Sequence, residues 1–537
     1  MNKKYIIGIA VLIIVIITII AAFSMNTNTT RADDELVVAV DTRNGEPEGG
    51  FDPLTGWASG HGTEPLIQSR LYRVNVNDTL ESDLATDYTT SADLKSYDVT
   101  IRDGVKFTDN SLLTAEDVAF TYNMAKENGA VDLGTLEEAT AVDDNTVRFR
   151  LNKPDSTFPY KFAALGIVPS DSYDNTTYGQ NPIGSGPYKL SQWNKGQQAI
   201  FEINDDYYGE KPYYKKITNL FIDHDAAFAA AQKGEVDIIE LPLSFANETI
   251  DGMSKVNISS IDLRGITLPV VASGGTTEDG SPIGNDVTSD IAIRQALNVG
   301  INRDEIIKGS YNGYGIASTT ITDPSLPFNY QQTISDGDID EAKRILGEGG
   351  WTDTDNDGIV EKDGRKAEFN LVYFTGGADS NFRQSIALQV SEQAKEFGIA
   401  ITPVGKSLDE IIPGVGYSDA FVLGAGNPNP YYIYGHLSGS EMRNEYNNMP
   451  SYNNSEVDAL MEQAMSQNLE SSYSTWARAV ELSQNDIPFV WIGSHDFLYF
   501  VSDSLDISVD THTLFPHTGD IFGNIYDWRP VNNNSTS

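Results

Sequence analysis

Three aspartates at alternate positions form the most regular chemical pattern in the chain. Asp353, Asp355 and Asp357 precede a glycine, as the first ligands of an EF-hand calcium loop precede its glycine turn. An EF-hand requires Glu at the twelfth position of the loop, where this chain has another glycine. A nearby carboxylate, Glu361 or Asp363, could complete a calcium site of different geometry. The pattern favours a polar hairpin with an Asp-Gly turn, and calcium binding is the second interpretation.

Histidine is the other residue type here that could bind a metal, and six histidines are scattered along the chain. His436, His495, His512 and His517 could ligate nickel or a nickel chelate. The alternative for each is a surface position or a hydrogen-bonded place in the core. The motifs G-x-S-x-G, H-E-x-x-H and G-x-x-x-x-G-K-[ST] do not occur. We therefore expect no catalytic residue, no ATP site and no cofactor.

Aromatic and polar side chains also lie in a long stretch rich in Gly and Pro, RNGEPEGGFDPLTGWASGHGTEP. Loops of this length without secondary structure are uncommon in compact domains and are often functional. Trp57 and His61 lie within it. They are candidates for ligand contact, with packing inside the loop as the alternative.

The composition limits the classes of partner. The chain has 537 residues, which predicts two or three domains. It carries 77 Asp and Glu against 36 Lys and Arg, a formal charge of -41, so nucleic-acid binding is excluded as a function. It contains no Cys, which rules out disulfides, thiolate metal sites and a lipid-modified cysteine. Sequons for N-glycosylation occur at Asn28, Asn77, Asn175, Asn247, Asn257, Asn453, Asn533 and Asn534.

An apolar run near the N-terminus predicts how the chain meets the membrane. Residues 5–23, YIIGIAVLIIVIITIIAAF, are long enough to cross the hydrocarbon core as one helix. Lys3 and Lys4 precede the run, so residues 1–4 are expected in the cytoplasm and the rest of the chain outside. Residues 24–34 would then be a tether. The alternative is a cleaved signal peptide, which also exports the chain.

Periodicity predicts the elements that would position these side chains. Residues 35–41 are expected to form a buried strand, and residues 97–101 alternate as a strand. Thr114 and Asp117 predict the capped start of a helix that ends at Gly129. Residues 367–374, 382–397 and 399–404 follow as strand, helix and strand, which predicts a βαβ unit with parallel strands. The fold class is therefore α/β.

The chain resembles the family 5 extracellular solute-binding proteins, the peptide- and nickel-type receptors of ATP-binding-cassette importers. The resemblance extends from Glu35 to Pro530 and rests on the order and spacing of short motifs. They are DLATDY, IRDGVKF, LTAEDVAFTY, NPIGSGPYKL, DDYYGEKPYYKK, GEVDI, SDIAIRQALNVGINRDEII, DEAKRILGEGGW, RQSIALQVSEQAKEFGI and SEVDALMEQA.

This resemblance implies a two-lobed type II periplasmic-binding-protein fold with a hinge. The implied segments are 35–268 for the first lobe with an extra subdomain, 269–488 for the second lobe, 489–532 for the return to the first lobe and 533–537 for a tail. The implied hinges lie near residues 263–271 and 486–493.

One segment, LGAGNPNPYYIY, resembles the family loop that faces the ligand. Dipeptide-type receptors place an Asp there to pair with the amino terminus of the peptide, whereas this chain has Gly and Asn. With loops at strand ends lining one pocket between the lobes, the expected ligand-binding residues are Trp57, His61, Arg383, Asn427, Asn429, Tyr431, Tyr432, Trp491 and His495. Arg383 could pair with a ligand carboxylate, with surface exposure as the alternative. Truncation of Asn429 or Trp491 is expected to weaken binding and to leave the core unchanged.

These features predict a receptor that captures a peptide or peptide-like solute and delivers it to a membrane permease. Amide donors and aromatic walls suit a peptide backbone, while a metal ion needs several converging His or carboxylate ligands. The partners would be the permease subunits, their separate ATPase subunits and the membrane. A nickel or nickel-chelate receptor is the alternative ligand class, and an exported hydrolase on the same fold is the alternative function class.

Overall fold

The computed structural model describes residues 31–40, 46–47, 49–55, 66–75, 79–129, 131–278, 280–376, 380–411, 414–444, 446–508 and 521–531. Within these residues, no helix combines the length and the apolar character needed to cross a membrane. The predicted membrane span, residues 5–23, lies outside the described residues, as do Trp57 and His61.

The first lobe is built on a seven-stranded mixed sheet with the order β12-β21-β11-β1-β10-β9-β8. Its elements are β1 (Glu35–Ala39), β8 (Tyr188–Asn194), β9 (Gln198–Ile203), β10 (Lys216–Leu220), α3 (His224–Gln232), β11 (Ile238–Leu241), β12 (Met253–Ile258) and β21 (Phe497–Ser502). Both faces of this sheet are buried, because alternate residues of one strand enter different clusters. Tyr499 lies in one cluster and its neighbours Leu498 and Phe500 in another. The strand predicted over residues 35–41 is confirmed as β1.

A subdomain, residues 71–185, is inserted between β1 and β8. Its four-stranded antiparallel sheet has the order β4-β5-β7-β6 and packs against α2 in a cluster of its own. Thr114 and Asp117 form the predicted capping box, and Gly129 ends α2 in a left-handed conformation (φ 65°). The elements are β2 (Tyr72–Val74), β3 (Leu80–Ser82), β4 (Ala85–Thr90), β5 (Ser96–Ile101), α2 (Ala115–Asn128), β6 (Leu136–Asp143), β7 (Thr146–Leu151), η2 (Phe158–Ala163) and η3 (Tyr178–Gln180).

The second lobe has a six-stranded sheet with the order β14-β20-β13-β19-β17-β18. Helices cover both faces: Val490 packs with α4, α5 and α7, and its neighbour Trp491 packs with α9, α10 and α11. The elements are β13 (Leu263–Thr267), α4 (Ile291–Gly300), α5 (Arg303–Tyr311), β14 (Gly315–Ala317), α6 (Ile339–Glu348), β17 (Glu368–Phe374), α7 (Ser380–Glu396), β18 (Ala400–Lys406), β19 (Ala420–Ala425), α9 (Tyr431–Leu437), α10 (Ser455–Met465), α11 (Leu469–Ser483) and β20 (Phe489–His495).

The predicted βαβ unit is confirmed. Strands β17 and β18 pair in parallel on either side of helix α7 in the sequence. The smaller elements are η1 (Pro53–Thr55), η4 (Leu243–Phe245), β15 (Glu361–Lys362), β16 (Arg365–Lys366), α8 (Leu408–Ile411), η5 (Val415–Tyr417), η6 (Gly439–Glu441), β22 (Leu505–Asp506), η7 (Ile521–Asp527) and β23 (Arg529–Pro530).

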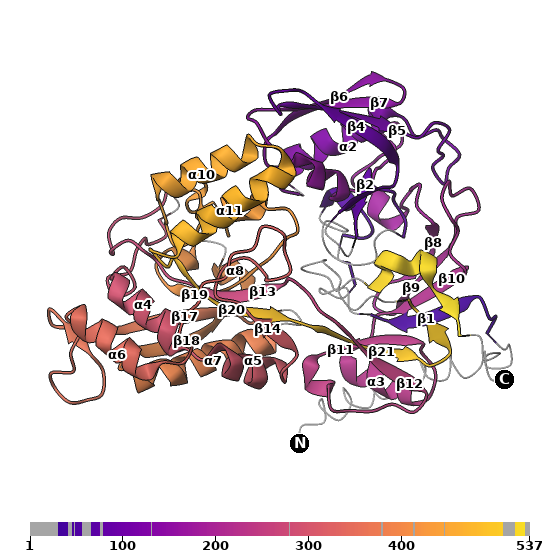
Figure 1. Cartoon of the computed structure of the whole chain (residues 1–537). Helices are drawn as coiled ribbons and strands as arrows, with labels where there is room; N and C mark the ends of the chain where they lie inside the picture. The colour runs from indigo at the N-terminus through magenta and orange to yellow at the C-terminus, as the bar shows by residue number, and fades with distance from the viewer. Residues whose placement is uncertain are drawn as a thin grey trace.

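Two segments carry the chain between the large sheets. Residues 259–262 join β12 of the first lobe to β13 of the second, and Asp496 joins β20 of the second lobe to β21 of the first. Figure 1 shows β20 and β21 as nearly one continuous ribbon between the two halves. The predicted boundaries at 268/269 and 488/489 are corrected by this pairing, because β13 and β20 both belong to the second sheet. Periodicity marks a strand but does not say which sheet the strand joins.

Candidate functional site

The first crossing segment is bonded to His495, the last residue of β20, which comes directly before the second crossing residue, Asp496. Ser260 Oγ donates a hydrogen bond to the carbonyl of His495 at 2.6 Å. The His495 Nε2 atom lies 3.1 Å from Asp262 Oδ2. The first crossing segment is therefore tied to the end of β20 through both a main-chain and a side-chain contact.

Asp262 forms a buried ion pair as well. Arg264 Nη1 contacts Asp262 Oδ1, and Arg264 Nη2 donates to Asp262 Oδ2 at 3.1 Å. The side chains are 0% and 1% exposed. The Arg264 guanidinium also lies 5.5 Å from the ring centre of Phe382. The sequence analysis did not select Arg264 as a site residue. The signal that could have revealed it is a charged residue inside the apolar strand LRGIT.

His495 is a core residue. Its ring packs among Tyr311, Phe382 and Phe497, with centroid distances of 5.5, 5.0 and 5.0 Å, and its Nδ1 lies 3.2 Å from the carbonyl of Asp496. Both ring nitrogens contact protein oxygen atoms in this conformation. Metal ligation by His495 would require one of these contacts to break.

Arg383 lies beside Arg264. Its Nη1 donates to the carbonyl of Val422 on β19 at 3.0 Å. A methyl group on Gly424 would lie 2.9 Å from Arg264 Nη1 and 3.3 Å from Arg383 Nη2. The two guanidinium groups therefore converge where β19 carries no side chain, and Asp262 balances the charge of Arg264.

The asparagines after β19 build the turn into α9. Asn427 Oδ1 accepts from the N–H of Asn429, and Asn429 Oδ1 accepts from the N–H of Tyr431, each at 2.9 Å. Tyr432 donates its hydroxyl proton to the carbonyl of Ile321 at 2.8 Å. Asn429 is 6% exposed. Because its side chain accepts a hydrogen bond from Tyr431, the first residue of α9, truncation of Asn429 would also disturb the start of this helix.

The burial of Trp491 corrects the expectation that its truncation would leave the core unchanged. Trp491 is 1% exposed, lies 5.3 Å from Phe489 between ring centres and belongs to the cluster under α9–α11. The expectation that its truncation leaves the core unchanged is wrong, because an indole in the middle of β20 packs against the helices of this face. Sequence alone does not say which face of a fully buried strand is lined by a helix.

The predicted ligand-binding residues that the structure describes therefore all lie in the second lobe. Trp491 and His495 come from β20, Arg383 from α7, and Asn427, Asn429, Tyr431 and Tyr432 from the segment after β19. Pairing of β13 with β19 and β20 brings Arg264 among them.

The aspartate pattern forms a cluster elsewhere in the second lobe. One carboxylate oxygen each from Asp353, Asp355, Asp357 and Glu361 can be chosen so that all lie within 4.8 Å of one another. Lys366 Nζ reaches the same place, 3.2 Å from Asp355 and in contact with Asp357. Hydrogen bonding to Lys366 lowers the pKa of Asp357, and the same contact raises that of Lys366.

A hairpin lies next to this cluster. Strands β15 and β16 pair across a turn at Asp363 and Gly364, with φ values of 54° and 76°. The cluster has the carboxylate chemistry of a calcium site, and Lys366 supplies a cation to it from within the chain. Among the described residues, no histidine joins a group of metal-ligating side chains.

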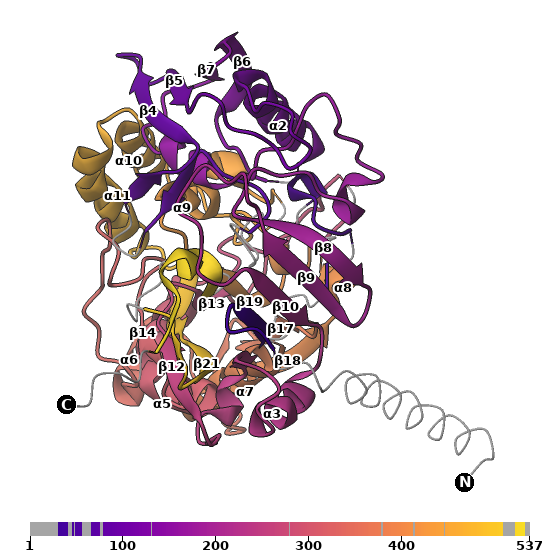
Figure 2. The ribbon, with the colours of Figure 1, turned by 90° about the vertical axis from the view of Figure 1, so that its right-hand side faces the viewer.

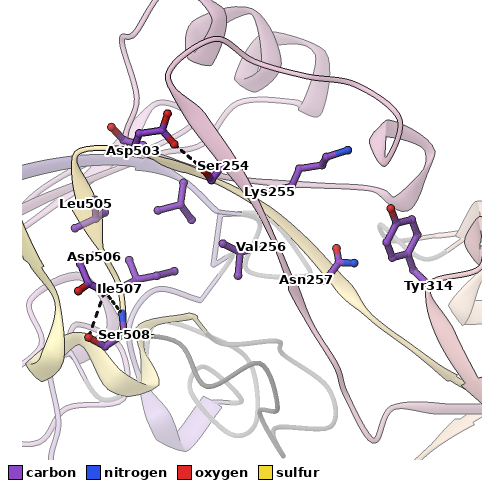
Figure 3. A pocket seen from close by; sticks show the side chains of 12 residues that line it. Ser254, Lys255, Val256, Asn257, Tyr314, Asp503, Leu505, Asp506, Ile507 and Ser508 are labelled. Carbon is purple, nitrogen blue, oxygen red and sulfur yellow. Dashed lines mark hydrogen bonds between the residues drawn. The ribbon is translucent and has the colours of Figure 1, made fainter. Parts of the chain in front are cut away.

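Two grooves contain none of the predicted site residues. A groove of about 540 Å³ lies over β12 and β21 and is bordered by residues 503–508. Figure 3 shows Val256 and Ile507 in it, with Ser254 hydrogen-bonded to Asp503 at 2.7 Å. A second groove, of about 690 Å³, lies between α4 and α6.

The chain matches a family profile over most of its length. The profile described as "Bacterial extracellular solute-binding proteins, family 5 Middle" matches residues 79–437. The oligopeptide-binding protein AppA of Bacillus subtilis (strain 168) is 28% identical over 530 residues, covering 90% of this chain and 92% of AppA. Protein XP55 of Streptomyces lividans is 30% identical over 423 residues, covering 76% of this chain and 74% of XP55.

Solved structures agree with the fold. The structure of AppA from Bacillus subtilis in complex with a nonapeptide has a TM-score of 0.70 at 24% identity, covering 93% of this chain and 99% of that chain. The structure of NikZ from Campylobacter jejuni in complex with Ni(L-His) has a TM-score of 0.74 at 23% identity, with the same coverage of 93% and 99%. At these identities the structural likeness shows the two-lobed α/β fold alone.

Proposed function

This chain belongs to the family of bacterial extracellular solute-binding proteins, family 5, and we propose that it captures a peptide or peptide-like solute between its two lobes for a membrane permease. The observation that carries the proposal is the family match over residues 79–437 of a chain whose two sheets are joined by two crossing segments. The 28% identity to an oligopeptide-binding protein over 90% of the chain supports a peptide as the ligand.

The ligand site we propose comprises Trp57, His61, Arg383, Asn427, Asn429, Tyr431, Tyr432, Trp491 and His495. Arg383 would bind a ligand carboxylate, and its position next to Arg264 and the bare Gly424 supports this role. A peptide backbone needs hydrogen bonds wherever water is expelled, which the amide groups of the Asn427 segment can supply.

Transport function follows from binding and closure without turnover. A ligand that contacts both lobes stabilises the closed form by its differential affinity for that form. A shift from about 1% to about 99% closed requires about 5.5 kcal/mol of that differential affinity. The closed protein would then dock on permease subunits whose ATPase subunits are separate chains.

The class of ligand can be tested with a panel of candidate ligands and thermal unfolding. Peptides of increasing length and nickel complexes of histidine are added to the purified protein, and the midpoint of thermal unfolding is measured. We expect a rise with peptides. A rise with nickel-histidine alone would favour the nickel-chelate alternative. A ligand recovered chemically changed would favour the exported hydrolase.

Substitution of Arg383 by Gln should weaken binding of peptides with a free carboxyl terminus by about 1.5–3 kcal/mol, because a hydrogen bond to a charged group is lost. Binding of the same peptide with an amidated terminus should change little. Calorimetry on both peptides measures the difference.

The matched control for this change is Arg344→Gln. Arg344 is an exposed arginine on α6 whose partners Glu341 and Glu348 belong to the same helix. Equal losses for the free and amidated peptides in the Arg383 variant would show that Arg383 does not bind the carboxylate.

We also propose that residues 5–23 remain as a membrane anchor. The apolar length of this run and the lack of any Cys for lipid attachment support the proposal. Sequencing of the N-terminus of membrane-extracted protein should then return the start of the chain. A mature end near Phe23 or later would instead identify a cleaved signal peptide.

A further inference from the structure

The subdomain of the first lobe touches the second lobe at a place far from the crossing segments. The N–H of Ser156 donates to the carbonyl of Met465 at 2.9 Å, and Ser156 Oγ donates to the carbonyl of Ala464 at 3.4 Å. These carbonyls belong to the last turn of α10, and the Ala464 carbonyl also accepts from the N–H of Gln467 at 3.1 Å. Figure 1 and Figure 2 both show the subdomain next to α10 and α11.

Two lysines of the same segment lie over tyrosine rings of α9. Lys153 Nζ is 3.9 Å from the ring centre of Tyr434, and Lys161 Nζ is 5.4 Å from that of Tyr431. A methyl group on Gly134 would lie 3.2 Å from the Tyr431 ring, so the subdomain backbone also approaches this ring closely. Both pairs link a cation of the first lobe to an aromatic face of the second.

An apolar contact completes this surface. Leu469, the first residue of α11, packs against a small cluster of Val74, Tyr160 and Ala163 in the subdomain. The hydroxyl groups of Tyr160 and Tyr473 lie 3.4 Å apart. We call the contacts of residues 153–163 with α9, α10 and α11 the rim contact.

The donor side of the rim contact is held by the subdomain itself. Asp155 is 1% exposed, and its carboxylate accepts from the N–H and hydroxyl of Thr157 and from the hydroxyl of Thr135. Tyr97 donates its hydroxyl proton to the carbonyl of Asp155 at 2.7 Å. None of these bonds involves the second lobe, so Ser156 is presented in the same way whether or not the lobes meet.

We propose that the rim contact is a latch that favours the closed arrangement of the lobes in the absence of ligand. Two surfaces that are each formed within one lobe meet through hydrogen bonds, cation–π contacts and apolar packing, with the crossing segments as the axis. The latch therefore sets the open–closed equilibrium through residues outside the proposed carboxylate site. The apparent dissociation constant of any ligand is its intrinsic value divided by the fraction of closed protein.

The first test uses no ligand, so its outcome does not depend on the proposed function. The chain contains no Cys, and Glu127→Cys on α2 with Glu462→Cys on α10 introduces two exposed labelling positions, one on each side of the rim contact. Single-molecule energy transfer between dyes at these positions reports the fraction of closed molecules. We expect the parent to be mainly closed.

The decisive variants are Lys153→Met and Leu469→Ala. Lys153→Met keeps an apolar stem and loses the cation over Tyr434, so we expect the ratio of closed to open molecules to fall about 2- to 30-fold. Its matched control is Lys195→Met, since Lys195 lies 4.8 Å over Trp193 within the first lobe only. Circular dichroism confirms that each variant is folded.

A second readout separates a latch residue from a ligand-contact residue. Variants of the latch should weaken the binding of chemically unlike ligands by one common factor, equal to the loss of closed molecules. The proposal is overturned if the Lys153 and Leu469 variants are folded and leave the closed fraction at the parent value. It is also overturned if the parent without ligand is mainly open.

Discussion

Replacing Asp262 by Ala is expected to lower the free energy of unfolding by about 3–5 kcal/mol, because it removes the carboxylate that pairs with the buried Arg264 guanidinium. Asp262 and Arg264 are 0% and 1% exposed, and Asp262 also faces the ring of His495 at 3.1 Å. Removal of the carboxylate therefore affects two buried polar side chains at once. Urea unfolding followed by circular dichroism and tryptophan fluorescence measures the change.

The control for Asp262 is a pair with the same chemistry at the surface. Asp98 binds Arg148 through two hydrogen bonds of 2.7 and 2.6 Å, and these side chains are 32% and 49% exposed. Asp98→Ala should change the free energy of unfolding by no more than about 1 kcal/mol.

The double variant Asp262→Ala, Arg264→Met removes both charges of the buried pair. It should recover part of the loss, because the buried cation is gone as well. A single Asp262 variant as stable as the parent would show that water reaches Arg264.

The regular parts of the fold could be predicted because local chemistry decides them. The capping box of Thr114 and Asp117 and the βαβ unit ending in β18 each depend on a few neighbouring residues. The family resemblance supplied the two-lobed arrangement, and the family match supports it. Neither kind of information identifies the partner of a given strand.

Strand partners explain the wrong lobe boundaries and the wrong expectation for the truncation of Trp491. β13 and β20 are apolar runs that would suit either sheet, and their pairing with β19, with β14 and with each other places them in the second lobe. The pairing of β13 with β19 puts Arg264 next to Arg383, which comes from a segment more than a hundred residues away. The choice of aromatic and amide residues in loops as site candidates could reveal neither the buried Asp262–Arg264 ion pair nor the burial of Trp491.

Tyr431 belongs both to the proposed ligand site and to the rim contact. The resemblance placed it among the ligand-binding residues, whereas its ring lies under Lys161 of the subdomain and stacks on Tyr434 at 5.4 Å. The segment after β19 therefore begins with asparagines next to the proposed carboxylate site and continues into the rim contact. The proposed ligand site and the rim contact therefore share a single stretch of chain.

Replacing Trp491 by Ala is expected to lower the free energy of unfolding by about 3–5 kcal/mol, because it removes a buried indole and leaves a cavity. Trp491 is 1% exposed and packs with Phe489 against the helices of one face. The loss should appear in the urea midpoint with no ligand present. Trp491→Phe, which keeps a ring at the same place, should lose less.

A double-mutant cycle with Gly265 tests whether the indole lies where the structure places it. A methyl group on Gly265 would lie 2.6 Å from Cε3 of Trp491, so Gly265→Ala alone should cost about 1–3 kcal/mol through overpacking. In the Trp491→Ala background the same methyl group enters the cavity and should cost little or stabilise. The loss of unfolding free energy in the double variant should thus be smaller than the sum of the two single losses by at least about 1 kcal/mol. Additive effects would show that the indole does not pack on Gly265.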